Sequence, residues 1–226
     1  MLDKLIDENN MQKSKVKFYK TVEKVKKHLA MIFHRFIEED NLQIYVNKNL
    51  LEAWNPFIRQ NPATMELACE ELFDGKTSVS IEPYILPHKT KFEDEEAFKK
   101  AGGAKDWLAH QGFYVYRNRR LIVYGTWFGK FKKEPAYNLA RIKLDMSSES
   151  DFEWGIDIKK SKATLPVSIE ESVIQIAYLA IEKSVAVYNS RGVYNRRNTG
   201  NNTSLKYVWE QRKNSSGNYM FYLNKK

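Results

Sequence analysis

The sequence predicts an α+β protein in which a mixed or antiparallel sheet packs against helices. Two long stretches, residues 12–38 and 168–188, place apolar residues at steps of three and four, which is the period of an amphipathic helix. Between them lie several short runs in which apolar and polar residues alternate, as in half-buried strands. With 226 residues, 42% of them hydrophobic, the chain is long enough to bury a substantial core.

The first long helix is expected over residues 12–38. Its apolar positions recur along one face: Phe18, Val22, Val25, Leu29, Ile32 and Phe36. The lysines of this stretch fall largely on other sides of the helix, where they would face water or an anion.

Four segments follow before the centre of the chain. Residues 42–47 alternate like a strand, and residues 63–73 suit either a short helix or an irregular segment. Residues 77–86 are the next expected strand, with Pro83 at a bulge or a sheet edge. Residues 93–105 predict a weak helix that ends in a loop at Gly102 and Gly103.

The centre of the chain is rich in expected strands. Residues 112–118 and 121–127 are separated by Arg119 and Arg120, a spacing that suits a tight hairpin. Residues 138–146 and 152–158 are two further alternating runs. This density of strands predicts one sheet at the centre of the fold.

The second long helix is expected to begin at Ser168. Ser168 is a candidate N-cap, because Glu171 follows three residues later in the pattern of a capping box. Its expected apolar face consists of Ile169, Val173, Ile176, Ala177, Ala180, Ile181 and Val185.

These elements predict three parts of the chain. Residues 1–40 form a connecting helix, residues 41–195 the main domain, and residues 196–226 a loop followed by the start of a further segment. Residues 196–204 are rich in Gly, Asn and Thr, which is typical of loops, and residues 219–223 are the last expected strand.

Composition excludes several classes of protein. No apolar run approaches the roughly 20 residues that a bilayer-spanning helix needs, and the N-terminal residues lack the apolar segment of a signal peptide. Cys69 is the one cysteine, so an intrachain disulfide and a Cys-cluster zinc site are excluded. We therefore expect a cytoplasmic protein, with Cys69 as a buried structural thiol and no membrane partner.

The net charge of +9 is concentrated in a few segments. Residues 13–35 carry eight basic residues and one acid, and residues 117–133 carry six basic residues and none. Aromatic and basic residues are interleaved over residues 114–133, which predicts phosphate contacts and stacking platforms for nucleic acid. The candidate contacts are Arg117, Arg119, Arg120, Lys130, Lys132 and Lys133. A solvated basic surface is the alternative.

No enzymatic motif is present in the chain. It has no P-loop, no G-x-G-x-x-G, no H-E-x-x-H and no G-x-S-x-G sequence. The four histidines are scattered without metal-ligand spacing, so we expect structural or surface roles for them and no metal site.

One segment, residues 154–166, places three lysines within four positions after an expected strand. These are Lys159, Lys160 and Lys162. A lysine at such a junction presents a compact charge with three donors, which suits a terminal phosphate. A solvated lysine cluster is the alternative. If the strand continues, Lys160 shares the face of Ile156 and Ile158, whereas Lys159 points the other way.

The stretches GFYVYRNRRLI (residues 112–122), LARIKLDM (139–146) and FEWGIDIKKSKATLP (152–166) resemble the transducer domain of bacterial ATPases of the GHKL superfamily. The MORC-like branch is the most similar, and MutL and the ATP-hydrolysing component of DNA gyrase are more distant. Residues 28–39, 42–47, 52–57 and 82–89 also resemble that family, so the resemblance covers roughly residues 22–188.

The resemblance implies a function. In this family, ATP and Mg²⁺ are held by a preceding Bergerat-fold domain, whose D-x-G-x-G motif is absent from this sequence. The chain would then be a piece of a longer ATPase and inactive alone. Lys160, with Lys159 and Lys162 as alternatives, would reach the γ-phosphate of ATP in the neighbouring domain and stabilise charge on the transferring phosphoryl group.

The resemblance also implies a left-handed βαβ crossover, with residues 112–118 and 121–127 as central strands under the helix that begins at Ser168. The partners implied are the ATP-binding domain, a second copy in a homodimer, and DNA. Two other interpretations remain open: a self-contained basic module that binds nucleic acid, and a structural interaction domain without a ligand.

Overall fold

The computed structural model describes residues 11–73, 78–146, 154–155, 163–190, 209–213 and 219–223. Contacts divide the chain into two units, Met1–Val193 and Tyr194–Lys226. In the second unit, β9 (Trp209–Lys213) pairs antiparallel with β10 (Tyr219–Leu223), which confirms the last expected strand.

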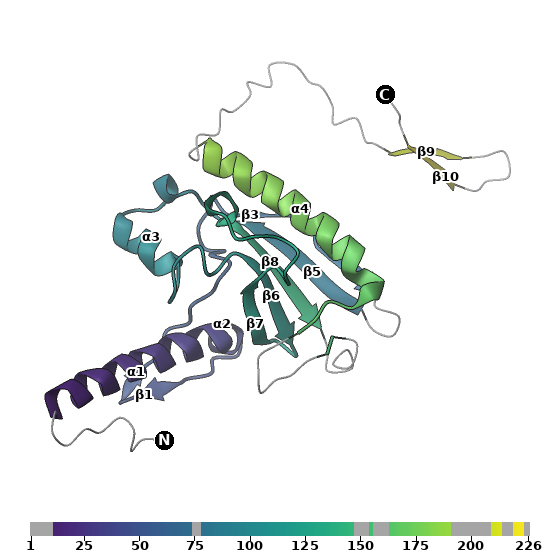
Figure 1. Ribbon diagram of the computed structural model, residues 1–226. Coiled ribbons are helices and arrows are strands. Elements are labelled where there is room, and N and C mark those ends of the chain that lie inside the picture. Colours follow the sequence, from purple (N-terminus) through teal and green to yellow (C-terminus); the bar gives the residue numbers. More distant parts are fainter. Residues whose placement is uncertain are drawn as a thin grey trace. The chain divides into compact units, whose positions relative to one another are not determined.

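A six-stranded sheet forms the centre of the first unit (Figure 1). Its strands are β3 (Met65–Glu66), β4 (Glu70–Phe73), β5 (Ser78–Ile85), β6 (Gly112–Arg117), β7 (Arg120–Thr126) and β8 (Ala140–Met146). The order is β3-β5-β8-β6-β7, and β4 also pairs with β5. Only β6 and β8 are parallel among the paired strands described, so the sheet is mixed. The predicted α+β class is confirmed.

Both faces of the sheet are covered by helices, as Figure 1 shows. Side chains alternate across a strand, so Phe113 and Val115 of β6 pack into the cluster that contains α4 (Val167–Asn189). Tyr114 and Tyr116 face the opposite side, where Met31 and Ile32 at the end of α1 (Met11–Ile32) cover them. Strand β6 is therefore buried on both faces, as a central strand is expected to be.

Helix α4 buries the predicted apolar face except Val185, which is only partly buried, and it begins at a different residue. Its buried residues are Ile169, Val173, Ile176, Ala177, Ala180, Ile181, Ser184 and Val187. The predicted N-cap at Ser168 is wrong, because the helix already begins at Val167 and Pro166 occupies the cap position without a side-chain hydrogen bond. The fixed φ of proline suits entry into a helix.

The N-terminal helix divides into two helices. Residue Phe33 separates α1 from α2 (His34–Glu39), although the apolar pattern continues through this point. Two contacts with the sheet hold α2: His34 Nε2 lies 2.8 Å from the Tyr116 hydroxyl, and Arg35 pairs with Asp145. Phe18 and Val25 of the predicted apolar face are 43% and 47% exposed, so the first part of α1 projects from the body.

The edge beside β5 is broken into two short strands. Residues 63–73 contain β3 and β4, so the helical alternative for this segment is wrong. Pro83 of β5 lies opposite the break between β3 and β4, and its carbonyl accepts a hydrogen bond from the Leu67 N–H at 3.0 Å. Proline has no N–H, and the N–H of another residue at this position would point toward the same broken edge. Cys69 in the break is exposed, which corrects its expected burial.

The remaining connections are short. The turn of the β6–β7 hairpin is Asn118-Arg119, both with positive φ, one residue before the predicted turn. A second hairpin joins β1 (Tyr45–Val46) to β2 (Asn49–Leu50). The predicted weak helix is α3 (Glu95–Ala101), capped by the Asp94 carboxylate. Among the described residues, η3 (Lys89–Lys91) and η4 (Pro135–Tyr137) are 3₁₀ turns.

Two fold details differ from the transducer expectation. Strand β7 lies at an edge of the sheet and is not central. The parallel strands β6 and β8 are connected through β7 and η4, with no α-helix between them. The predicted strand over residues 152–158 lies mostly outside the described residues, and within it Trp154 and Gly155 form a turn.

Candidate functional site

The lysine segment, residues 154–166, has its two ends joined at the edge of the core. The backbone N–H and the hydroxyl of Thr164 both donate to the Trp154 carbonyl, at 2.8 and 3.1 Å. Trp154 is fully buried and Leu165 is also buried. Lys159, Lys160 and Lys162 lie between these anchors and outside the described residues. The base of the segment is thus fixed by hydrogen bonds and apolar packing.

A glycine allows this closure. Gly155 has φ +52°, a left-handed conformation that side chains disfavour, and a Cβ at this position would lie 2.9 Å from the Thr164 hydroxyl. A side chain at residue 155 would therefore strain the backbone and crowd the Thr164 hydroxyl. We refer to the contacts among Trp154, Gly155 and Thr164 as the clasp.

The predicted arginines lie at one end of the sheet. In the strand register, Arg117 of β6 lies opposite Arg120 of β7 at the end of the hairpin, and it also lies beside Met146 of β8. The Asn118 N–H donates to the Met146 carbonyl at 3.0 Å. Strand β8 ends at Met146, so the arginines lie beside the C-terminal end of this strand.

Two of these arginines are engaged by the helices. Arg119 pairs with Glu39 and Asp40 at 2.6 and 2.9 Å. These two carboxylates raise the pKa of the Arg119 guanidinium above its ordinary value. The guanidinium of Arg120 lies 5.3 Å from the Phe33 ring centroid. The hairpin end is therefore held against α2 and is only partly available to a phosphate.

The predicted lysines lie beyond the opposite end of β7. Lys130 pairs with Glu170 of α4 at 2.5 Å. Lys133 donates to the Ala109 carbonyl at 2.8 Å, and Lys132 is exposed. Burial, and then the charge of Lys105, lower the pKa of Lys133. Strand β7 separates these lysines from the arginines, so the six predicted residues form no single patch.

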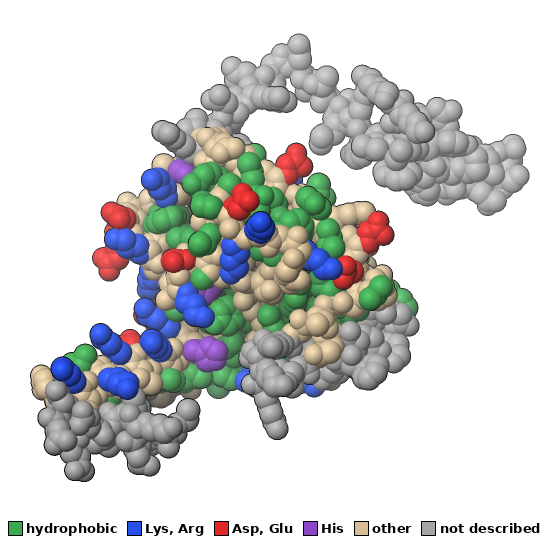
Figure 2. Space-filling view, viewed as in Figure 1, with side chains coloured by type: hydrophobic (Ala, Val, Ile, Leu, Met, Phe, Trp, Pro, Cys, Tyr) green, Lys and Arg blue, Asp and Glu red, His purple; other side chains and the backbone are tan. Residues whose placement is uncertain are grey.

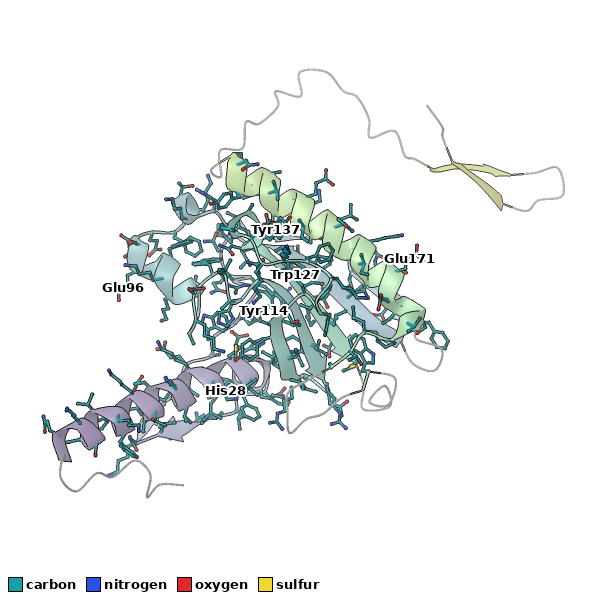
Figure 3. The ribbon with its side chains drawn as sticks, in the orientation of Figure 1. His28, Glu96, Tyr114, Trp127, Tyr137 and Glu171 are labelled. Carbon is teal, nitrogen blue, oxygen red and sulfur yellow. The ribbon has the colours of Figure 1, made fainter. Side chains whose placement is uncertain are left out.

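The stacking platforms expected between these basic residues are largely inside the protein. Tyr114 and Tyr116 are fully buried, and Trp127 is 2% exposed beneath α4 (Figure 3). Burial raises the pKa of Tyr114 to about 12. A base cannot stack on these rings without unfolding the sheet, so the interpretation of residues 114–133 as an aromatic binding surface is wrong for these three residues.

A buried arginine, Arg141, lies among aromatic rings. Arg141 of β8 is fully buried, donates to the Pro56 carbonyl, and leaves Nε and Nη2 without a partner. Its guanidinium carbon lies 5.4, 5.3 and 5.9 Å from the ring centroids of Trp54, Trp107 and Tyr114. Burial lowers the pKa of Arg141, because the cation has lost its water.

His110 lies beside this arginine. It is 1% exposed, and its Nδ1 lies 3.2 Å from the Tyr114 hydroxyl, which itself donates to the His110 carbonyl. Because the Tyr114 hydroxyl donates its one proton to the His110 carbonyl, it can only accept from Nδ1, which therefore carries the imidazole proton. Nε2 is then an acceptor without a hydrogen-bond partner. Burial, then the charges of Arg141, Lys133 and Lys105, lower the pKa of His110 to about 3. His110 is neutral at physiological pH.

An open groove of about 850 Å³ borders His110. One wall is α1, and the other includes Ala104, Lys105, His110 and Tyr124. We call it the α1 groove. The sequence predicts that the lysines of α1 face water or an anion, but it indicates no site there, because the facing wall comes from residues about 80 positions away along the chain.

Comparisons with known proteins give no relative: no family model, no curated protein and no solved structure matches the chain. The described residues hold no cluster of three or more side chains suited to a metal ion. None of the helices in the described ranges has the length and hydrophobicity needed to span a bilayer.

Proposed function

We propose that this chain is the transducer portion of a GHKL-type ATPase, which couples ATP binding and hydrolysis in a preceding domain to a change in conformation. ATP and Mg²⁺ are bound by that domain. Lys160 reaches the γ-phosphate, with Lys159 and Lys162 as the alternatives. The protein acts in the cytoplasm, as a homodimer and on DNA.

The observation that carries this proposal is the clasp. It fixes both ends of the lysine segment to the core, through the Trp154 carbonyl and the Trp154 side chain. A lysine that stabilises charge on a transferring phosphoryl group has to be placed within hydrogen-bond reach of it. A segment anchored at both ends limits the positions that its lysines can take, whereas a free tail does not.

The clasp also offers a route for coupling. Thr164, its second anchor, is followed by Leu165 and then by α4, which packs across β5 and β8. A change in the lysine segment on loss of the γ-phosphate would act directly on the start of α4. The left-handed βαβ crossover that the resemblance implies also belongs to this proposal, with α4 as the main covering helix of the sheet.

The test uses the protein in which an ATP-binding domain precedes this chain. Lys160→Ala is expected to lower kcat for ATP hydrolysis by about 10²-fold or more, as for loss of one preorganised donor, with little change in nucleotide affinity. Lys183→Ala, which removes an exposed lysine of α4, is the matched control. Unchanged turnover in Lys160→Ala would exclude the assignment. The chain alone should neither bind nor hydrolyse MgATP.

The nucleic-acid interpretation of residues 114–133 loses support from the burial of Tyr114, Tyr116 and Trp127. The α1 groove, in contrast, has both lysine amines and tyrosine rings among its lining residues.

A further inference from the structure

The α1 groove has a basic wall. Lys20, Lys24 and Lys27 lie at helical spacing on α1, so they form a row with rises of about 6 and 4.5 Å along the helix. Lys105 lines the opposite wall. Within the described part of the chain, these four amines make no ion pair. Figure 2 shows Lys and Arg side chains gathered along α1 and on the neighbouring body.

Few negative charges oppose this wall. Among the described residues, Glu23 is the one acid that lines the groove, and it pairs with Lys26 at 2.8 Å. Besides burial, the charges of Arg141, Lys133 and Lys105 lower the pKa of His110, and the charge of Asp106 opposes them. The groove therefore has a positive potential, which favours an anion with several charges.

Ring surfaces lie within the same groove. Tyr19 is 53% exposed on α1. Tyr124, half-buried, lies nearly parallel to the His110 ring, with 5.7 Å between the centroids and 16° between the planes. The His110 stack holds the Tyr124 ring in a fixed orientation. Figure 3 labels His28, which also lines the groove from α1.

We propose that the α1 groove binds single-stranded nucleic acid. The row of lysines takes successive phosphates, and Tyr19 and Tyr124 take unpaired bases by stacking. A row of amines is better matched to a chain of phosphates than to one isolated phosphate. Rings set among the amines suit bases that are unstacked, whereas an acidic peptide would use the charges alone. This inference does not rest on the proposed γ-phosphate role of Lys160, and either can fail without the other.

The experiment measures fluorescence anisotropy of a labelled 20-nucleotide mixed-sequence DNA strand with the whole chain, over a series of salt concentrations. Each phosphate neutralised in a single strand contributes about 0.7 to the slope of log K against log salt. Lys20→Gln/Lys24→Gln/Lys27→Gln is expected to lower that slope by about 2 and to weaken binding on the order of 100-fold at 0.1 M salt. The matched control is Lys15→Gln/Lys89→Gln/Lys183→Gln, which removes the same charge from exposed positions outside the groove.

A second pair of variants tests stacking. Tyr19→Ala should weaken binding roughly 5- to 150-fold, since a base stacked on an aromatic ring is worth that much by alanine substitution. Tyr19 is exposed and helical, so alanine is compatible with folding there. Tyr45→Ala removes an equally exposed tyrosine outside the groove and should leave affinity unchanged.

Three results would overturn the proposal. One is equal weakening by the two triple variants, which would mean that net charge alone drives binding. Another is a duplex of the same sequence binding as tightly as the strand. The third is competition by polyglutamate at equal charge concentration, which would make the groove a general anion site.

Discussion

The burial of His110 predicts how the free energy of unfolding depends on pH. Its pKa is about 3 in the folded protein, because burial and the neighbouring cations disfavour the imidazolium, whereas an unfolded histidine has a pKa near 6.5. Between pH 6.5 and 3 the unfolded state therefore binds the proton and the folded state does not. This group thus destabilises the fold progressively as the pH falls below about 6.5.

From pH 7 to pH 5, this difference in proton binding removes about 2 kcal/mol from the free energy of unfolding. The assay is urea denaturation at both pH values for the wild type, for His110→Gln, which stays neutral, and for His28→Gln as an exposed control. The loss should be smaller by about 2 kcal/mol in His110→Gln and unchanged in His28→Gln. Parallel pH profiles for the wild type and His110→Gln would refute this account of His110.

Two further predictions concern the clasp and the arginine among the rings. Thr164→Val removes the hydroxyl donor to the Trp154 carbonyl and should lower the free energy of unfolding by about 0.5–1.5 kcal/mol. Gly155→Ala places a side chain at φ +52° and should lower it by about 1–2 kcal/mol. Urea midpoints equal to that of the wild type would contradict the role of the clasp. Arg141→Ala should lower the free energy of unfolding by about 2–5 kcal/mol, because it leaves a cavity. Arg141→Met fills that space and removes an unpaired buried charge, so its free energy of unfolding should stay within about 1–2 kcal/mol of the wild type. Equal losses of stability for the two variants in calorimetry would contradict this interpretation of Arg141.

Periodicity predicted the elements whose burial is decided locally. The face of α4 from Ile169 to Val187 follows the 3.6-residue period, and the alternation in β6 and β8 gave the strands of the centre. Boundaries were less accurate, since Asn118 and Arg119 both adopt positive φ and move the hairpin turn by one residue. That choice depends on strand register, which the pattern does not state.

Features that depend on distant contacts were not predictable. The separation of α1 from α2 at Phe33 comes with contacts of His34 and Arg35 to Tyr116 and Asp145 of the sheet. The burial of Tyr114 and Tyr116 follows from helices covering both faces of β6, whereas the sequence pattern of rings and cations suggested exposure. The α1 groove likewise needs two walls that are far apart in sequence.

The central claim is that Lys160 lies next to the γ-phosphate of ATP bound by the preceding domain. An acyl-phosphate derivative of ATP tests it directly in the protein that contains both domains. A lysine amine beside the phosphates attacks the acyl carbon, keeps the acyl group as an amide and releases ATP. Peptide mapping is expected to find the acyl group on Lys160, or on the alternative Lys159 or Lys162, and excess ATP should prevent the reaction. ATP-protected labelling that is confined to lysines outside this segment would contradict the claim.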